Sequence, residues 1–260
     1  MFNEYVSRTI KFWSMIGLII IVLIIAGIIM FKYDVEGEKK LPYKLSKITI
    51  ISTAEGIEDT SDETDENAWN LNVIQINDVY ISIDKTEFAK ENQLLSGVRI
   101  ENIQVTKSPA RGGVRIYMPI STEGRLYNYS NDYLVQSTLQ YKGASKSNPK
   151  TLEIGNQGGL ALISFSNTQL GKFKSVEKNV EIRHDGTLVS KINEFLDVNN
   201  TATITQQDIE FSVSFDLVIK IDNNEYKGTV SLDLPCGNVI TDGTGTVEIT
   251  DFSNVVFKKI

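Results

Sequence analysis

The stretch IEFSVSFDLVIKIDNNEYKGTVSLDL, residues 209–234, decides the fold class of this chain. Every second residue of 209–221 is apolar, and every second residue of 226–234 is apolar or glycine. A period of two places these side chains on one face of a strand. The polar residues 222–225 between the two halves have the chemistry of a turn. The stretch therefore predicts an antiparallel hairpin with one buried face.

Strand patterns recur through much of the chain. The sequence predicts further strands at residues 45–52, 71–83, 98–105, 114–118, 133–141, 160–165 and 246–257. The apolar residues of 98–105 share no single face, which predicts a β-bulge near Glu101 and Asn102. The turn residues 109–113, PARGG, predict that the strands before and after them form a hairpin.

Helix patterns are few in this part of the chain. An apolar stripe at helical spacing predicts a short helix at residues 187–197, and residues 87–95 are a second candidate. Because helices do not alternate with strands, a parallel sheet is not expected.

A second decisive stretch, FWSMIGLIIIVLIIAGIIMF at residues 12–31, carries no charge and lies between Lys11 and Lys32. A bilayer core of about 30 Å needs roughly 20 apolar residues at a rise of 1.5 Å per residue. The apolar region of a cleaved signal peptide is shorter, about 7–15 residues, and is followed by small residues. We therefore predict a transmembrane signal anchor at residues 12–32, after a short cytoplasmic tail at residues 1–11.

These patterns together define the predicted architecture. We expect an all-β fold in which a single N-terminal transmembrane helix is followed by an antiparallel β-sandwich-like ectodomain with one or two short helices. A linker at residues 33–44 would join the anchor to a β-rich domain at residues 45–260. A division of that domain into two β-subdomains near residues 124–130 stays open.

The location of the domain follows from the anchor and from cysteine usage. A long domain behind an N-terminal anchor is translocated largely regardless of its charge. We therefore expect a single-pass protein of the cell membrane with its C-terminal domain outside. Cys236 is the single cysteine, which excludes an intrachain disulfide framework and favours a bacterial cell surface over a eukaryotic one.

Net charge narrows the class of partner. The chain carries a net charge of −7, and residues 32–260 have 24 basic and 32 acidic residues, or −8. Nucleic acids and anionic polymers need a basic footprint. We therefore expect no nucleic-acid partner, whereas metal cations, cationic partners and neutral glycans stay compatible with this charge.

Cys236 and His184 are the first candidates for chemistry. An anchored β-rich domain with a His before a Cys resembles a sortase, a transpeptidase with a thiol nucleophile, a His proton partner and an Arg that stabilises the oxyanion. Sortases have the pattern T-L-x-T-C with an Arg after it. Here the approach to Cys236 is SLDLPC, and no Arg follows it. We interpret Cys236 as a small buried or turn residue, and His184 as part of a turn.

Other candidate groups favour structural interpretations. The acidic residues of 55–66 have oxygen ligands that suit Ca²⁺, but they lack the EF-hand pattern, so a solvated loop is the preferred interpretation and Ca²⁺ binding stays open. The glycines of 155–159 are not followed by the Lys of a phosphate-binding loop. A mid-chain group of tyrosines could form a sugar- or peptide-binding platform. Its members are Tyr117, Tyr127, Tyr129, Tyr133 and Tyr141.

Four segments of the chain carry a resemblance to a known group of proteins. These are SKITIISTAEGI at residues 46–57, and residues 154–159, 184–192 and 249–257. The chain resembles uncharacterised signal-anchored, β-rich membrane proteins of Gram-positive bacteria. The resemblance implies a common architecture that faces the cell envelope, and it implies no known activity and no functional residue.

The sequence thus predicts a membrane-anchored extracytoplasmic β-domain that binds or organises cell-envelope components and is not an enzyme. Its expected partners are the lipid bilayer, through residues 12–32, and an unidentified envelope protein or glycan. No catalytic, cofactor-binding or metal-binding residue is assigned, and no cofactor is expected. A carbohydrate-binding module and a sortase-like cysteine transpeptidase are the alternative hypotheses.

Overall fold

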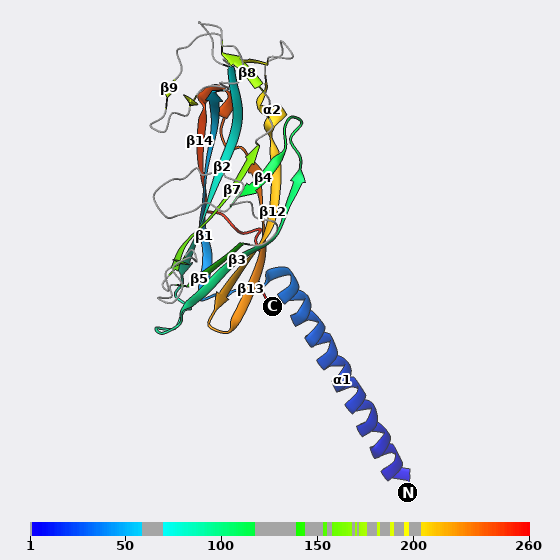
Figure 1. The fold of residues 1–260 in the computed structure, drawn as a ribbon. Coiled ribbons are helices and arrows are strands. Elements are labelled where there is room, and N and C mark those ends of the chain that lie inside the picture. Colours follow the sequence, from blue (N-terminus) through cyan, green and yellow to red (C-terminus); the bar gives the residue numbers. More distant parts are fainter. Residues whose placement is uncertain are drawn as a thin grey trace.

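A computed structural model describes residues 2–58, 70–117, 139–143, 153–154, 158–167, 170, 172–175, 181–182, 188–189, 195–197 and 204–260. A long helix projects from one end of an elongated β-domain (Figure 1). This helix, α1 (Phe2–Glu36), contains a candidate membrane span at Lys11–Glu36. None of the span is buried against the rest of the protein, as expected of a helix whose apolar surface faces lipid.

The first sheet is built around two long central strands. These are β1 (Tyr43–Glu58) and β2 (Asn70–Lys85), which pair antiparallel along almost their whole length. The strands β14 (Thr244–Ile249), β10 (Leu188–Val189) and β9 (Glu181–Ile182) extend the sheet from β1. The strands β7 (Gly158–Asn167), β4 (Val114–Tyr117), β8 (Lys172–Ser175) and β11 (Phe195–Asp197) extend it from β2.

The second sheet contains the predicted hairpin. Strands β12 (Phe211–Ile221) and β13 (Asn224–Leu234) pair in continuous register around the turn at Asp222 and Asn223. The sheet order is β15 (Lys258–Lys259), β13, β12, β3 (Leu95–Lys107), β5 (Leu139–Gly143) and β6 (Glu153–Ile154). All described pairings of both sheets are antiparallel except the short β5–β6 pair.

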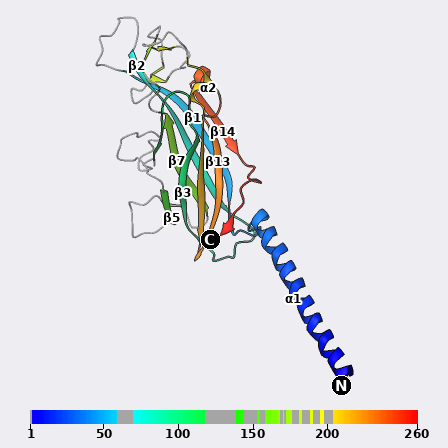
Figure 2. The same ribbon diagram turned by 90° about the vertical axis from the view of Figure 1, so that its right-hand side faces the viewer.

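The two sheets pack face to face and enclose one apolar core, so the predicted sandwich-like fold is confirmed (Figure 2). The alternating residues of β12, from Phe211 to Ile221, are all buried, and so are Val230, Leu232 and Leu234 of β13. The first sheet contributes inward-facing residues of β1, β2 and β7. These include Ile48, Ile50, Val79, Ile81, Ile163 and Phe165. Burial of this apolar surface is the main term that holds the sheets together.

The register of the strands shifts at several points, and two of these β-bulges change which residues face the core. The pairing of β12 with β3 matches Ser214 to Gln104 and Asp216 to Glu101, so Asn102 and Ile103 together face one residue of β12. Asn102 has a positive φ of 52°. This is the bulge that the broken alternation predicts. A second bulge, between Leu45 and Lys47 of β1, moves the buried set from odd to even residues.

Four local expectations are wrong. Residues 188–189 and 195–197 are strands β10 and β11 and not one helix, and residues 87–92 are turns. The short helices are instead α2 (Gln206–Ile209) and α3 (Val239–Asp242). Strand β4 pairs with β7 of the first sheet and not with β3. The predicted strand at residues 246–257 ends at Ile249, because the chain there leaves the first sheet and reaches the second as β15.

The segment that crosses between the sheets lies against β13. Phe257 is buried, and the inward position of Gly228 leaves room for it, since a Cβ there would lie 3.1 Å from the Phe257 ring. This segment therefore closes one edge of the sandwich close to the point where α1 enters the domain.

Candidate functional site

The end of the domain nearest α1, which we call the base, consists of residues 37–41, 86–94 and 250–260. In both ribbon views α1 leaves the domain at this end, and the C-terminus lies beside the last turn of the helix (Figures 1 and 2). Strand β1 begins at the base, and its 16 residues extend away from it for about 50 Å. The base therefore lies next to the bilayer if α1 spans one.

Helix α1 is fastened to the C-terminal segment by short polar contacts. The backbone N–H of Lys259 donates to the Tyr33 hydroxyl over 2.9 Å, and the N–H of Glu38 donates to the Phe257 carbonyl over 2.7 Å. The Lys258 ammonium lies 3.0 Å from an Asp34 carboxylate oxygen. These contacts tie the helix to β15, which pairs with β13. The first and last parts of the chain thus form one junction.

Gly37 makes the junction possible. It has a φ of +65°, a left-handed conformation that glycine adopts without strain. A Cβ at this position would lie 2.4 Å from the Phe257 carbonyl oxygen and 2.7 Å from a Val256 methyl group. A side chain at residue 37 therefore cannot coexist with the observed packing.

A groove of about 360 Å³ opens at the base. Its apolar lining includes Phe252, Val255 and Phe257 of the crossing segment, and Phe88 of the loop at residues 86–94 forms part of its wall. Lys39 and Lys44 also line it, together with one acidic residue, Glu87. The groove thus combines apolar side chains with two lysines and one acid, a mixed lining that suits an amphipathic anion.

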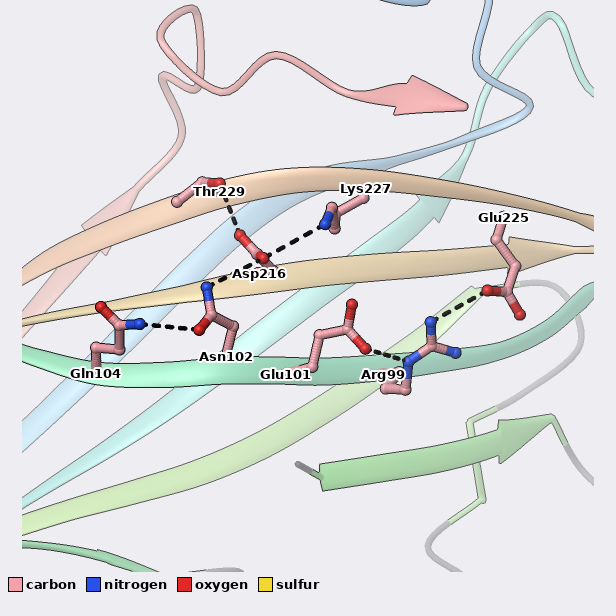
Figure 3. A network of polar contacts seen from close by, with 8 residues as sticks. All are labelled: Arg99, Glu101, Asn102, Gln104, Asp216, Glu225, Lys227 and Thr229. Carbon is pink, nitrogen blue, oxygen red and sulfur yellow. Dashed lines mark hydrogen bonds and ion pairs between the residues drawn. The ribbon is translucent and has the colours of Figure 1, made fainter. Parts of the chain in front are cut away.

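A second polar arrangement covers the outer face of the second sheet. We call it the polar ladder; it crosses β3, β12 and β13 (Figure 3). Its members are Arg99, Glu101, Asn102, Gln104, Asp216, Glu225, Lys227 and Thr229.

Asp216 is the centre of the ladder. Its Oδ1 accepts a hydrogen bond from the Thr229 hydroxyl over 2.7 Å, and its Oδ2 accepts one from the Asn102 amide over 3.4 Å. Lys227 Nζ lies 3.7 Å from the same Oδ2. The Asn102 contact joins the bulge of β3 to β12, so this part of the ladder holds the bulge in place.

Arg99 is the second centre of the ladder. Its Nε donates to Glu101 over 2.7 Å, and its Nη2 donates to Glu225 over 3.1 Å. The hydrogen bond and the charge of Arg99 lower the pKa of Glu225, although burial opposes this shift. A carboxylate with a lowered pKa and bound cations is a poor general base. The geometry favours a structural clasp across three strands over an acid–base site.

Cys236 is buried and lies between the sheets at the far end of β13. Its Sγ is 3.2 Å from the Ser52 hydroxyl and 3.5 Å from the Ile50 carbonyl, and its own N–H donates to Ser52 over 2.9 Å. Ser52 in turn donates to the Asn77 amide oxygen over 2.7 Å. The hydrogen-bonding partners of the thiol, Ser52 and Ile50, are neutral, and a reactive thiol needs an electropositive, partly exposed environment. This geometry fits the buried residue that the sequence analysis favours.

The other sequence candidates lie largely outside the described residues. His184, most of the acidic run at residues 55–66, most of the glycine cluster at 155–159, and Tyr127, Tyr129 and Tyr133 belong to this group. Of the remaining tyrosines, Tyr117 is in β4 of the first sheet and Tyr141 is in β5 of the second. Those two positions therefore do not share one sheet. Within the part of the chain that the structure describes, no group of three or more His, Cys, Asp and Glu could hold a metal ion.

Sequence reasoning missed both the groove and the ladder. The groove draws on three segments that are far apart in the chain, so only the fold brings them together. The sequence held one signal of the ladder. Asp216 places a negative charge on the polar face of β12, opposite the predicted bulge.

No protein-family model matches this chain, and neither does any curated protein or solved structure. What stands of the resemblance to signal-anchored proteins is therefore the coarse architecture, an N-terminal apolar helix followed by two antiparallel sheets.

Proposed function

We propose that this chain is a membrane-anchored extracytoplasmic β-domain that binds or organises components of the cell envelope and has no catalytic activity. In this proposal residues 12–32 span the cell membrane, residues 1–11 are cytoplasmic and the sandwich lies outside. The observation that carries it is the junction of α1 with the C-terminal segment, through Tyr33, Asp34 and Glu38. A domain fixed to its anchor in this way holds its outer faces at a defined position above the bilayer, which suits a scaffold.

The geometry of Cys236 supports the non-enzymatic interpretation over the sortase-like alternative. A nucleophile must be reached by substrate, and this thiol is 9% exposed and in contact with Ser52. The glycan-binding alternative depends on a platform of tyrosines. Tyr117 and Tyr141 lie in different sheets, so they do not support such a platform.

The orientation is tested by cysteine labelling of intact Gram-positive cells that produce the full chain. Thr241→Cys places a thiol at an exposed position of α3, and Asn3→Cys places one before the anchor. A membrane-impermeant maleimide should label the variant at residue 241 on intact cells, and the variant at residue 3 only after permeabilisation. Buried Cys236 serves as the internal blank. The reverse labelling pattern would show that the domain is cytoplasmic.

The binding role is tested by cross-linking on the same cells, followed by purification of the full chain. The proposal expects a defined envelope protein or glycan to co-purify. Turnover of an envelope substrate by the purified chain, abolished by a point substitution, would show that the chain is an enzyme.

A further inference from the structure

We propose that the groove at the base binds the phosphate and glycerol region of a phospholipid in the same bilayer that α1 spans. The base would then lie on the membrane surface, with Phe88 in the interface. This inference rests on the membrane insertion of α1 in the proposed function, and it holds for either orientation of the chain.

The length of α1 places the groove at the right height. The apolar run ends at Phe31, and the helix continues to Glu36. Five residues at 1.5 Å each add about 7.5 Å, which matches the head-group layer of about 5–8 Å on each side of the hydrocarbon core. The junction then holds residues 37–41 against Phe257. The groove that Lys39 helps to line therefore begins at the level of the head groups.

Exposed apolar side chains concentrate at the same end. Beyond α1, five large apolar side chains of the described residues are strongly exposed. Three of them, Phe88 (45%), Leu94 (41%) and Ile260 (57%), belong to the base. Single exposed apolar residues are common on soluble surfaces, but a group of them beside a membrane span is typical of an interfacial contact.

The charges of the groove select the ligand. The part of the chain that follows the anchor is acidic overall, yet the groove has two lysines, Lys39 and Lys44, and one acid, Glu87. Lys39 also pairs with Glu36 over 2.8 Å, an exposed contact of small net energy. A lipid phosphate provides the anion for the lysines, and its glycerol carbons suit the apolar side chains of Phe252 and Val255.

Depth measurement on the full chain in lipid nanodiscs tests this contact. A Cys236→Ala background carries either Phe88→Cys or the control Thr241→Cys, each labelled with an environment-sensitive fluorophore. Residue 241 lies in α3, which contacts the far part of β1 about ten residues from its start, so it is about 30 Å from the base. The label at residue 88 should be shielded from iodide and blue-shifted in nanodiscs, and the label at residue 241 should stay accessible. Equal accessibility of the two labels would overturn the proposal.

Changes of lipid composition and substitution of the two lysines test whether the lysines bind the lipid phosphate. Shielding at residue 88 should increase when phosphatidylglycerol replaces part of the phosphatidylcholine. Lys39→Gln with Lys44→Gln should remove that increase, because one lysine near an anionic surface changes such an equilibrium about fivefold. Glycerol phosphate in solution should not reproduce the shift, since the label reports contact of residue 88 with the bilayer. Composition-independent shielding, or an increase that survives the double substitution, would refute the role of the lysines.

Discussion

The junction at Gly37 yields the sharpest prediction, because one methyl group should open it. In Gly37→Ala the new Cβ would lie 2.4 Å from the Phe257 carbonyl oxygen, which is backbone and cannot rotate away. The φ of +65° adds about 1–2 kcal/mol of strain for alanine. Separation of the two segments also breaks the Glu38 hydrogen bond to Phe257, worth about 1 kcal/mol. The variant should therefore weaken the junction by about 2–3 kcal/mol.

Trypsin cleavage after Lys39 and Lys40 measures the open junction directly. Both side chains are exposed, but their backbone is held between α1 and β1 while the junction is closed. When opening is fast, the cleavage rate follows the open population. A change of 2–3 kcal/mol then predicts cleavage about 30- to 150-fold faster than in the unchanged chain, with mass spectrometry of the released anchor fragment as the readout.

Two controls separate this local effect from a general one. Gly17→Ala is the matched substitution, because a Cβ at residue 17 has no neighbour within 4 Å, and it should leave the rate unchanged. Cleavage after Lys90, in the exposed loop of the base, serves as an internal reference for the folded domain. An unchanged rate after Lys39 in Gly37→Ala would refute the steric argument. An equal increase at Lys90 would show that the whole domain, and not the junction, is destabilised.

Three further predictions concern the sandwich and are measured by urea or acid unfolding. Phe215→Ala removes a side chain that is 1% exposed and should lower the free energy of unfolding by about 3–5 kcal/mol, whereas Ser214→Ala on the opposite face should change it by less than about 0.5 kcal/mol. Asn102→Ala should lower the free energy of unfolding by about 1–2 kcal/mol more than Asn102→Gly does. Both substitutions remove the amide, but only alanine is strained at a φ of +52°. The pKa of Glu225 is lowered by Arg99, so its carboxylate stabilises the fold above its ordinary pKa, and this contribution is lost as the pH falls through the lowered value. Glu225→Gln should therefore flatten the loss of stability as the pH falls below the ordinary glutamate pKa of 4.5, and an unchanged pH profile would contradict the role of the ladder.

The sheet pattern was predictable where one face of a strand is buried along its whole length. The alternation of residues 209–221 specifies β12, and the alternation of residues 226–234 specifies β13. A slip of the register by one residue would expose every apolar side chain of these strands. The bulge at Asn102 was predictable for the same reason, since only an extra residue lets Ile100 and Ile103, three positions apart, both face the core.

Partner choice was not predictable in the same way. The turn at residues 109–113 reverses the chain, but it does not determine which strand β4 joins. That choice depends on Asn167, whose amide donates to the Arg111 carbonyl over 2.8 Å and accepts from the Gly113 N–H over 2.9 Å. The Arg111 N–H also donates to the Asp208 carbonyl over 2.8 Å. These contacts come from residues about 55–100 positions away, and they hold the loop beside β7.

The expected helix at residues 187–197 shows the limit of periodicity in short segments. Leu188, Val189 and Phe195 fit one helical stripe, yet β-branched and aromatic residues of this kind also suit short strands. In the structure residues 188–189 pair with β1, and residues 195–197 pair with β8. Pairing with existing strands satisfies their backbone groups, so the tertiary context outweighs a weak local preference.

The path of the chain links α1 to the second sheet through very few residues. A change in the tilt of α1 acts on Tyr33 and Asp34, whose partners belong to β15, and β15 is bonded to β13. The polar ladder then joins β13 to β12 and β3 through Asp216 and Glu225. A scaffold of this design would keep a fixed angle between its outer face and the bilayer. If the junction is weakened at Gly37, the domain should keep its fold but lose that angle, so envelope binding that depends on orientation should fall while stability of the sandwich stays the same.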